Sequence, residues 1–199
     1  MSIVCLDLEG VLIPEIWISF AEKTGIDELR LTTRDISDYD VLMKKRISIL
    51  KDNNLRLNDI QNVIDEMDPL EGAKDFLAKL RKRTQVIILS DTFTQFAKPM
   101  MEKLDWPTLF CNTLIIDDNG SIVDYKLRQT NGKKQAVLAL QSIGYRIIAG
   151  GDSYNDIDML KTAETGILFK APDNILKEYP QFAGVKEYND FFSIIEKNL

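Results

Sequence analysis

Acidic side chains follow three short apolar runs of the chain. Asp7 and Glu9 stand in "CLDLEGVL", Ser90 and Asp91 end "QVIILSD", and Asp152 ends "RIIAGGD". If these runs end side by side, several carboxylates share a small volume, and like charges a few ångströms apart repel unless a cation joins them. Mg²⁺ prefers carboxylate, carbonyl and water oxygens and usually sits beside a phosphate. The pattern therefore predicts a magnesium site that handles a phosphate group.

Asp7 and Glu9 suit two steps of a phosphoryl transfer. A carboxylate can attack phosphorus as a nucleophile and form an aspartyl-phosphate that water later cleaves, and Asp7 is the candidate. Residues two apart in an extended strand point to the same side, so Glu9 could protonate the leaving alcohol and then deprotonate the incoming water. Asp7 could also be a helix cap or turn residue, but the two other runs that end in acids favour the catalytic interpretation.

Composition excludes several classes of site and partner. The 199 residues contain no histidine, which removes histidine-dependent triads, histidine nucleophiles and histidine zinc sites. Cys5 and Cys111 lie in apolar runs, where we expect buried free thiols. The net charge of −6 is spread over mixed-sign segments, so nucleic acid is not an expected partner. No stretch reaches the roughly 18 to 20 apolar residues of a membrane span, and no signal core is evident, so we expect a cytoplasmic protein without a membrane partner.

The elements that position these acids alternate between strands and helices. Short runs rich in Val, Ile and Leu predict buried parallel strands at 2–8, 85–91, 146–152 and 165–169. Apolar residues at helical spacing predict helices at 71–83, 94–104, 133–143 and 155–163, with a terminal helix over "DFFSIIEKN". This alternation predicts an α/β fold with a Rossmann-like parallel sheet. Ligands of such sheets bind at the carboxyl ends of the strands, where the acids stand.

Two segments interrupt the alternation. Residues 15–69 contain helical patterns without a sheet strand, which predicts a helical cap inserted after the first strand; residues 1–14 and 70–199 would form the core. Residues 114–128 alternate around Asp118-Asn119-Gly120, a turn sequence that predicts a small β-hairpin. The segment "KEYPQF" at 177–182 is expected to be a surface loop.

Four short motifs in order resemble those of the haloacid dehalogenase-like phosphatases. They are "DLEGV" at 7–11, "ILSD" at 88–91, a lysine in "GKKQ" at 132–135 and "GDSYND" at 151–156. The resemblance covers nearly the whole chain and is strongest to the phosphoserine phosphatases, because "EIW" at 15–17 and "KKRISILKD" at 44–52 are similar to their cap segments. The sequence is most similar to the bifunctional phosphoserine phosphatase/homoserine phosphotransferase type, which also has Glu where most of the superfamily has a second Asp.

The resemblance implies a role for each matching position. Asp7 would be nucleophile and metal ligand, Glu9 the acid/base with its backbone carbonyl on Mg²⁺, and Asp152 a further ligand. Phosphate would bind Ser90, the backbone N–H of Asp91 and a lysine, Lys133 or, since one sequence leaves the register open, Lys134. The remaining implied residues are Asn155 at the phosphate or substrate, Asp156 in the outer shell of the metal, and Glu15 and Arg46 at the amino and carboxylate groups of the substrate.

Three functions stay open at this point. The resemblance favours a Mg²⁺-dependent phosphatase of O-phospho-L-serine, with homoserine as an alternative acceptor of the phosphoryl group. A broader phosphatase of sugar phosphates or nucleotides is the second, although the opposite charges of Glu15 and Arg46 suit a zwitterion better. A phospho-aspartate receiver module is the third, and its phosphorylated aspartate would live much longer than that of an enzyme. The expected partner is a small phosphorylated amino acid; the sequence leaves the oligomeric state open, a homodimer included.

Overall fold

The computed structural model describes residues 1–33, 35–36 and 38–199. Within these residues, seven strands form one sheet in the order β4-β3-β2-β1-β5-β6-β7. All neighbouring strands pair in parallel except β3 and β4, which are antiparallel. The strands are β1 (Ser2–Leu6), β2 (Gln85–Phe93), β3 (Thr108–Ile116), β4 (Ile122–Lys126), β5 (Arg146–Gly151), β6 (Thr165–Phe169) and β7 (Ala183–Val185). The α/β class and the mostly parallel sheet are confirmed.

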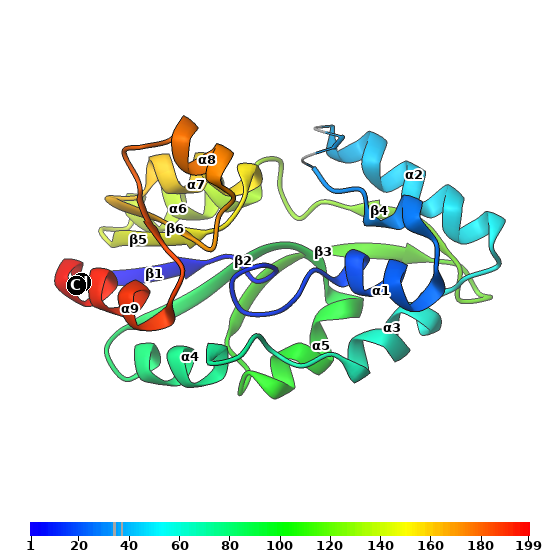
Figure 1. The fold of residues 1–199 in the computed structure, drawn as a ribbon, viewed down its shortest axis with the longest axis horizontal. Coiled ribbons are helices and arrows are strands. Elements are labelled where there is room, and N and C mark those ends of the chain that lie inside the picture. Colours follow the sequence, from blue (N-terminus) through cyan, green and yellow to red (C-terminus); the bar gives the residue numbers. More distant parts are fainter. Residues whose placement is uncertain (34, 37) are drawn as a thin grey trace.

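Helices cover both faces of this sheet (Figure 1). On one face lie α4 (Ala73–Arg81), α5 (Thr94–Lys103) and α9 (Tyr188–Asn198). On the other lie α6 (Gly132–Ser142), α7 (Ile157–Thr162) and α8 (Asp173–Glu178), with the short 3₁₀ turn η2 (Tyr154–Asp156) leading into α7. In the part of the chain that the structure describes, none of the helices has the length and hydrophobicity of a membrane span.

The strand β1 shows why the sheet needs both layers. All five of its residues are buried, and the four from Ile3 to Leu6 alternate between two apolar clusters. Val4 and Leu6 belong to the cluster under α4 and α5, whereas Ile3 and Cys5 belong to the cluster under α6 and α7. Cys5 is thus a buried thiol as expected; Cys111 is only half-buried, so that expectation was wrong for Cys111.

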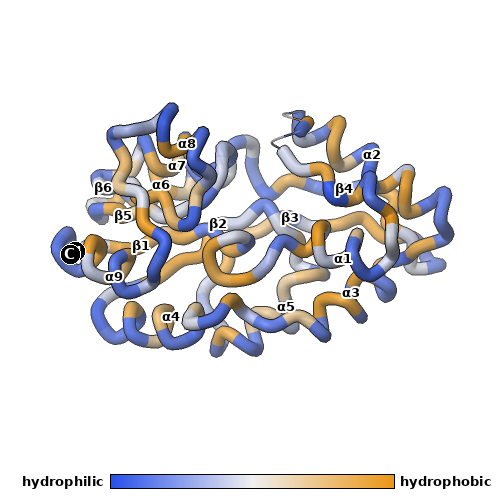
Figure 2. Tube along the Cα trace, in the orientation of Figure 1, coloured by the Kyte–Doolittle hydropathy of each residue, from blue (hydrophilic) through white to orange (hydrophobic). Residues whose placement is uncertain are grey.

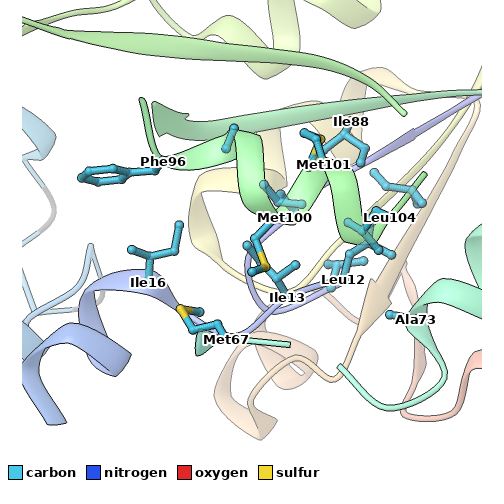
Figure 3. Close-up of a cluster of buried hydrophobic side chains, with 14 of the residues drawn as sticks. Leu12, Ile13, Ile16, Met67, Ala73, Ile88, Phe96, Met100, Met101 and Leu104 are labelled. Carbon is cyan, nitrogen blue, oxygen red and sulfur yellow. The ribbon is translucent and has the colours of Figure 1, made fainter. Parts of the chain in front are cut away.

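Residues 15–69 contribute α1 (Ile16–Thr24), the 3₁₀ helix η1 (Asp27–Arg30), α2 (Tyr39–Asp52) and α3 (Leu57–Glu66). These helices share the larger apolar cluster with the sheet, because α3 packs on α5 and α2 packs on β4. Figure 2 shows apolar residues alternating with polar ones along these helices. In Figure 3, Ile16 and Met67 approach Phe96 and Met100 of α5. The apolar core is therefore continuous between residues 15–69 and the sheet.

The observed elements differ from the expected ones mainly at their ends. β1 stops at Leu6, so Asp7 follows the strand, and β2 runs to Phe93. The hairpin is present, with Gly120 at a φ of +82° in its turn, but its first strand begins at Thr108 and pairs with β2. The prediction of a loop at 177–182 was wrong at its start, because α8 runs to Glu178. The sequence patterns had not predicted α8 or β7.

Candidate active site

The parallel pairing of β1, β2 and β5 brings the three acidic strand ends together. Asp7 follows β1 and donates its backbone N–H to the carbonyl of Gly150 in β5, 2.9 Å away. Ser90 lies on β2, and Asp152 follows β5. Asp7, Ser90 and Asp152 are all buried. The convergence of these side chains at one edge of the sheet follows from the strand order.

Lys133 lies at the centre of the acidic group. Its Nζ is 2.9 Å from Oδ1 of Asp7 and 2.6 Å from Oδ1 of Asp156, and all three side chains are almost fully buried. Burial favours the neutral amine, but the carboxylates of Asp156, Asp7 and Asp91 outweigh it and raise the pKa of Lys133 well above its usual range. Lys134 is instead partly exposed, and its Nζ lies 3.9 Å from Oδ2 of Asp158. Of the two candidate lysines, Lys133 is therefore the one beside Asp7.

Three buried carboxylates could hold a cation. Ligand atoms of Asp7, Asp152 and Asp156 lie within 4.8 Å of one another. Burial, together with the charges of Asp156 and Asp152, raises the pKa of Asp7 well above its usual range against the opposing effect of Lys133. The backbone makes room for this group at Gly10, where φ is +77° and a Cβ would come within 2.6 Å of the Asp152 carboxylate. Buried oxygen donors with excess negative charge fit a hard divalent cation such as Mg²⁺.

Asp156 also organises the chain around this group. Its Oδ2 accepts the backbone N–H groups of Asp152 (3.0 Å) and Ser153 (3.2 Å), while Oδ1 accepts a hydrogen bond from Lys133. The side chain is completely buried. These contacts hold the turn after β5 and aim the lysine, so Asp156 has the contacts of an orienting residue as well as a position among the acids.

Glu9 lies apart from the three acids. Its Oε2 accepts the backbone N–H of Ile16 at 2.9 Å, which turns the carboxyl group towards the start of α1. Burial is the main factor that raises the pKa of Glu9 to about 8, and the charge of Glu15 adds to it. The backbone N–H of Ile16 and the charge of Arg46 oppose this shift. A carboxyl group that keeps its proton near neutral pH can act as a general acid.

Arg46 approaches the cavity from α2. The guanidinium is buried, stacks over the ring of Trp17 with its Cζ 4.6 Å from the ring centroid, and donates from Nη2 to the carbonyl of Leu31 at 2.7 Å. Among the residues that the structure describes, its buried Nε has no hydrogen-bond partner. Burial lowers the pKa of Arg46 to about 10, opposed by the charge of Glu9, so the group stays cationic at neutral pH. An anionic ligand group would satisfy Nε.

Residues 90–92 lie in the last part of β2, where the pairing with β3 shifts register between Leu89 and Phe93. A side-chain hydrogen bond closes a local turn in this irregular stretch, which is called the turn at 90–92 below. The Oγ of Ser90 accepts the backbone N–H of Thr92 at 3.1 Å. The carboxylate of Asp91 accepts a hydrogen bond from Nδ2 of Asn155 at 2.9 Å and lies 3.8 Å from Nζ of Lys133. The Asn155 side chain also contacts the hydroxyl of Ser153. The turn is thus tied to the strand end that carries Asp152.

One cavity joins these groups. Its walls include the expected residues Asp7, Glu9, Glu15, Arg46, Ser90, Asp91, Lys133 and Asn155. Asp152 and Asp156 are not among its lining residues and lie behind Asp7 and Lys133. The structure therefore brings all the expected residues into one region and orders them in two layers.

Several lining residues were not expected from the sequence. Trp17 lines the cavity, and its ring lies against the guanidinium of Arg46. Tyr39, Leu42 and Thr92 line it as well. Tyr39 and Leu42 precede Arg46 by seven and four residues, so helical spacing placed them on the face of Arg46 and was a usable signal. Nothing in the local sequence marked Thr92.

Comparisons with known proteins agree on one family. The model of the haloacid dehalogenase-like hydrolases matches residues 1–164. Phosphoserine phosphatase ThrH of Pseudomonas aeruginosa is 59% identical over 190 residues, which cover 96% of this chain and 93% of that protein. A phosphoserine phosphatase of Methanocaldococcus jannaschii is 28% identical, with 89% of each chain covered. A solved structure described as a phospho-aspartyl intermediate analogue of phosphoserine phosphatase superposes with a TM-score of 0.76 at 27% identity, covering 94% of each chain.

Proposed function

Because the chain belongs to the haloacid dehalogenase-like hydrolase family, we propose that it hydrolyses O-phospho-L-serine in a Mg²⁺-dependent reaction through a phosphorylated Asp7. Two curated relatives with the name phosphoserine phosphatase, at 59% and 58% identity, support the substrate. The solved phospho-aspartyl intermediate analogue supports a covalent intermediate in that relative. We assign the same role in this chain to Asp7, the carboxylate beside Lys133.

The observation that carries the proposal is the pairing of two kinds of recognition in one cavity. Asp7, Ser90 and Lys133 offer a nucleophile, a hydroxyl and a cation for a phosphoryl group. Glu15 and Arg46 line the same cavity and offer one negative and one positive charge. A zwitterionic amino acid with a phosphate on its side chain matches both sets, whereas a sugar phosphate has no group for Glu15 and Arg46.

In the first step, an oxygen of Asp7 attacks phosphorus while the bond from phosphorus to the serine oxygen breaks. Glu9 gives its proton to that oxygen, so serine leaves as the neutral alcohol. Lys133 neutralises the carboxylate that carries the phosphoryl group, and Ser90 and the backbone N–H of Asp91 hold phosphoryl oxygens. Bound at Asp7, Asp152 and the backbone carbonyl of Glu9, Mg²⁺ would supply charge neutralisation at the phosphoryl oxygens.

In the second step, water enters where serine left and gives a proton to Glu9 as its oxygen attacks phosphorus. The bond between Asp7 and phosphorus breaks, which releases inorganic phosphate and restores the carboxylate. Homoserine is also an alcohol with amino and carboxylate groups, so Glu15 and Arg46 could hold it in place of water. We propose this transfer as a second activity, favoured by the 59% identity to a relative named ThrH.

The test measures both fates of the phosphoryl group. The purified protein is incubated with Mg²⁺ and O-phospho-L-serine, with and without homoserine, and inorganic phosphate and phosphohomoserine are quantified. Hydrolysis predicts phosphate equal to serine when homoserine is absent, and transfer predicts phosphohomoserine formed at the expense of phosphate when it is present. Turnover of sugar phosphates or nucleotides with kcat/KM equal to that of phosphoserine would contradict the proposed substrate. A phosphorylated Asp7 that persists for hours would indicate a receiver module.

A further inference from the structure

The hydroxyl group of Tyr39 joins α2 to the turn that would hold the phosphate. Tyr39 is the first residue of α2, and its Oη donates to the backbone carbonyl of Asp91 at 3.1 Å. Burial and the charge of Asp91 raise the pKa of Tyr39, so the hydroxyl keeps its proton and remains a donor. Residues 15–69 are thereby linked directly to the turn at 90–92.

The same carbonyl has a second donor that does not come from residues 15–69. Nδ2 of Asn112, a buried residue of β3, donates to the carbonyl of Asp91 at 3.2 Å. Ser90 and Thr92 contribute a further hydrogen bond within the turn. Loss of the Tyr39 hydroxyl would therefore leave the turn anchored to the sheet, while α2 would lose its link to the turn.

Tyr39 and Arg46 belong to the same face of α2. They are seven residues apart, about two helical turns, and both line the candidate active-site cavity. A helix moves largely as a rigid rod, so a contact at its first residue also sets the position of a residue two turns on. Figure 1 shows α2 lying over β4, at the opposite end of the molecule from α9.

We infer that Tyr39 is a positioning residue whose hydroxyl holds α2, and with it Arg46, in register with the phosphate-binding turn. The inference rests in part on the proposed function, since it assigns Arg46 to the amino-acid part of the substrate. The loss of the Tyr39 hydroxyl should therefore lower the turnover of a substrate that contacts both Arg46 and the turn at 90–92. It should have little effect on the turnover of a phosphate ester that contacts the turn alone.

Tyr125→Phe provides a matched control for Tyr39→Phe. The Tyr125 hydroxyl also contacts α2, donating to Oδ1 of Asp40 at 2.8 Å, but this hydrogen bond is exposed. The two tyrosine rings pack against each other with centroids 5.6 Å apart, so each substitution removes one hydroxyl and leaves the ring contact in place. The variants differ in whether the lost hydrogen bond reaches the turn.

The first measurement compares two substrates. Tyr39→Phe is expected to lower kcat/KM for phosphoserine by about 3- to 10-fold, the value of one hydrogen bond, while a small aryl phosphate changes less than about twofold. Tyr125→Phe should leave both substrates unchanged. In an Arg46→Ala background, Tyr39→Phe should cause no further loss on phosphoserine, because its effect is transmitted through Arg46. The inference would be overturned if the losses in kcat/KM from Tyr39→Phe and Arg46→Ala multiplied in the double variant. It would also be overturned if Tyr39→Phe lowered kcat/KM equally for phosphoserine and the aryl phosphate.

The second measurement does not depend on activity. Amide hydrogen exchange over residues 39–46 without substrate should be faster in Tyr39→Phe than in the wild type, and faster than in Tyr125→Phe. Unchanged exchange would overturn the inference even if phosphoserine is the substrate. A wild-type protein that does not turn over phosphoserine would contradict the proposed function, and the exchange experiment would still decide whether Tyr39 holds α2.

Discussion

Asp7 and Glu9 stand two residues apart in different surroundings, and we expect their substitutions to impair different steps. Asp7 contacts Lys133, whereas Glu9 accepts a hydrogen bond from Ile16. Asp7→Asn should abolish both turnover and phosphate incorporation into the protein, because an amide is a poor nucleophile. Glu9→Gln should slow formation and breakdown of the phosphorylated protein, each by about 10²- to 10⁴-fold, because both need its proton. Rapid-quench measurement of labelled phosphate distinguishes the two. Substantial activity in Asp7→Asn would mean that water attacks phosphorus directly.

The raised pKa of Glu9 also has a consequence for stability. The ordinary value of 4.5 applies to the unfolded chain, whereas burial raises the pKa to about 8 in the folded protein. Between these values the unfolded chain has lost the proton and the folded protein still holds it. The unfolded state then binds fewer protons, so the free energy of unfolding falls with rising pH, by at most ~1.4 kcal/mol per unit.

Glu9→Gln removes this dependence, because the amide stays neutral in both states. Denaturant unfolding at pH 5 and pH 8 in the presence of a chelator should show a smaller loss of stability in the variant than in the wild type. Other buried acids, Asp7 among them, contribute equally to both proteins, so the difference isolates Glu9. Identical pH dependence in the two proteins would argue against a protonated Glu9 in the fold.

At the scale of elements, α2 carries Arg46 and packs on β4 of the sheet. Arg46 is buried against Trp17, and no described residue forms a hydrogen bond with its Nε. If Arg46 binds the substrate carboxylate, Arg46→Ala leaves that carboxylate buried without its partner, at a cost of roughly 2 to 5 kcal/mol in kcat/KM for phosphoserine. A small aryl phosphate should be nearly unaffected. Arg46→Lys keeps the positive charge but lacks the planar guanidinium, so its kcat/KM for phosphoserine should lie between those of the wild type and Arg46→Ala.

Thermal unfolding of the Arg46 variants provides the control, because the guanidinium also packs on Trp17 and holds the carbonyl of Leu31. A folded Arg46→Ala that loses equal activity on both substrates would show that Arg46 supports the cavity wall or the phosphate. The broader phosphatase would then be favoured over phosphoserine specificity.

At the scale of the whole molecule, we expect metal binding at the buried acids to affect both stability and activity. Repulsion among Asp7, Asp152 and Asp156 opposes folding, and a divalent cation that binds only the folded state relieves it. Mg²⁺ should therefore raise the melting temperature in a concentration-dependent way. Chelation should nearly abolish turnover, Mg²⁺ should restore it, and Ca²⁺ should support little.

Asp152→Asn is the matched variant for this experiment, because it removes one charge and keeps nearly the same volume. It should be more stable than the wild type in chelator and should respond less to added Mg²⁺. Full activity of the wild type in excess chelator would contradict the metal site, whatever the effect on melting temperature.

Much of the fold and of the site could be predicted from the sequence. The runs at 2–8, 85–91 and 146–152 predict parallel strands because their apolar residues are continuous, and the acids that follow them must meet at one edge of the sheet. The segment without strand patterns at 15–69 predicted helices there. These signals are local: each can be recognised within a dozen residues, and the parallel topology then brings their ends together.

Other features were decided only by the tertiary structure. The choice between Lys133 and Lys134 depends on how α6 is rotated against the sheet, and only Lys133 reaches Asp7 and Asp156. Basic residues on a helix face are usually solvated, but Arg46 is buried, with contacts to Trp17 and to the carbonyl of Leu31 that lie outside α2. The contact of Tyr39 with Asp91 joins residues 52 positions apart. Local periodicity specifies which side of a helix is apolar, but the atoms that meet across the site are selected by long-range packing, which no local pattern encodes.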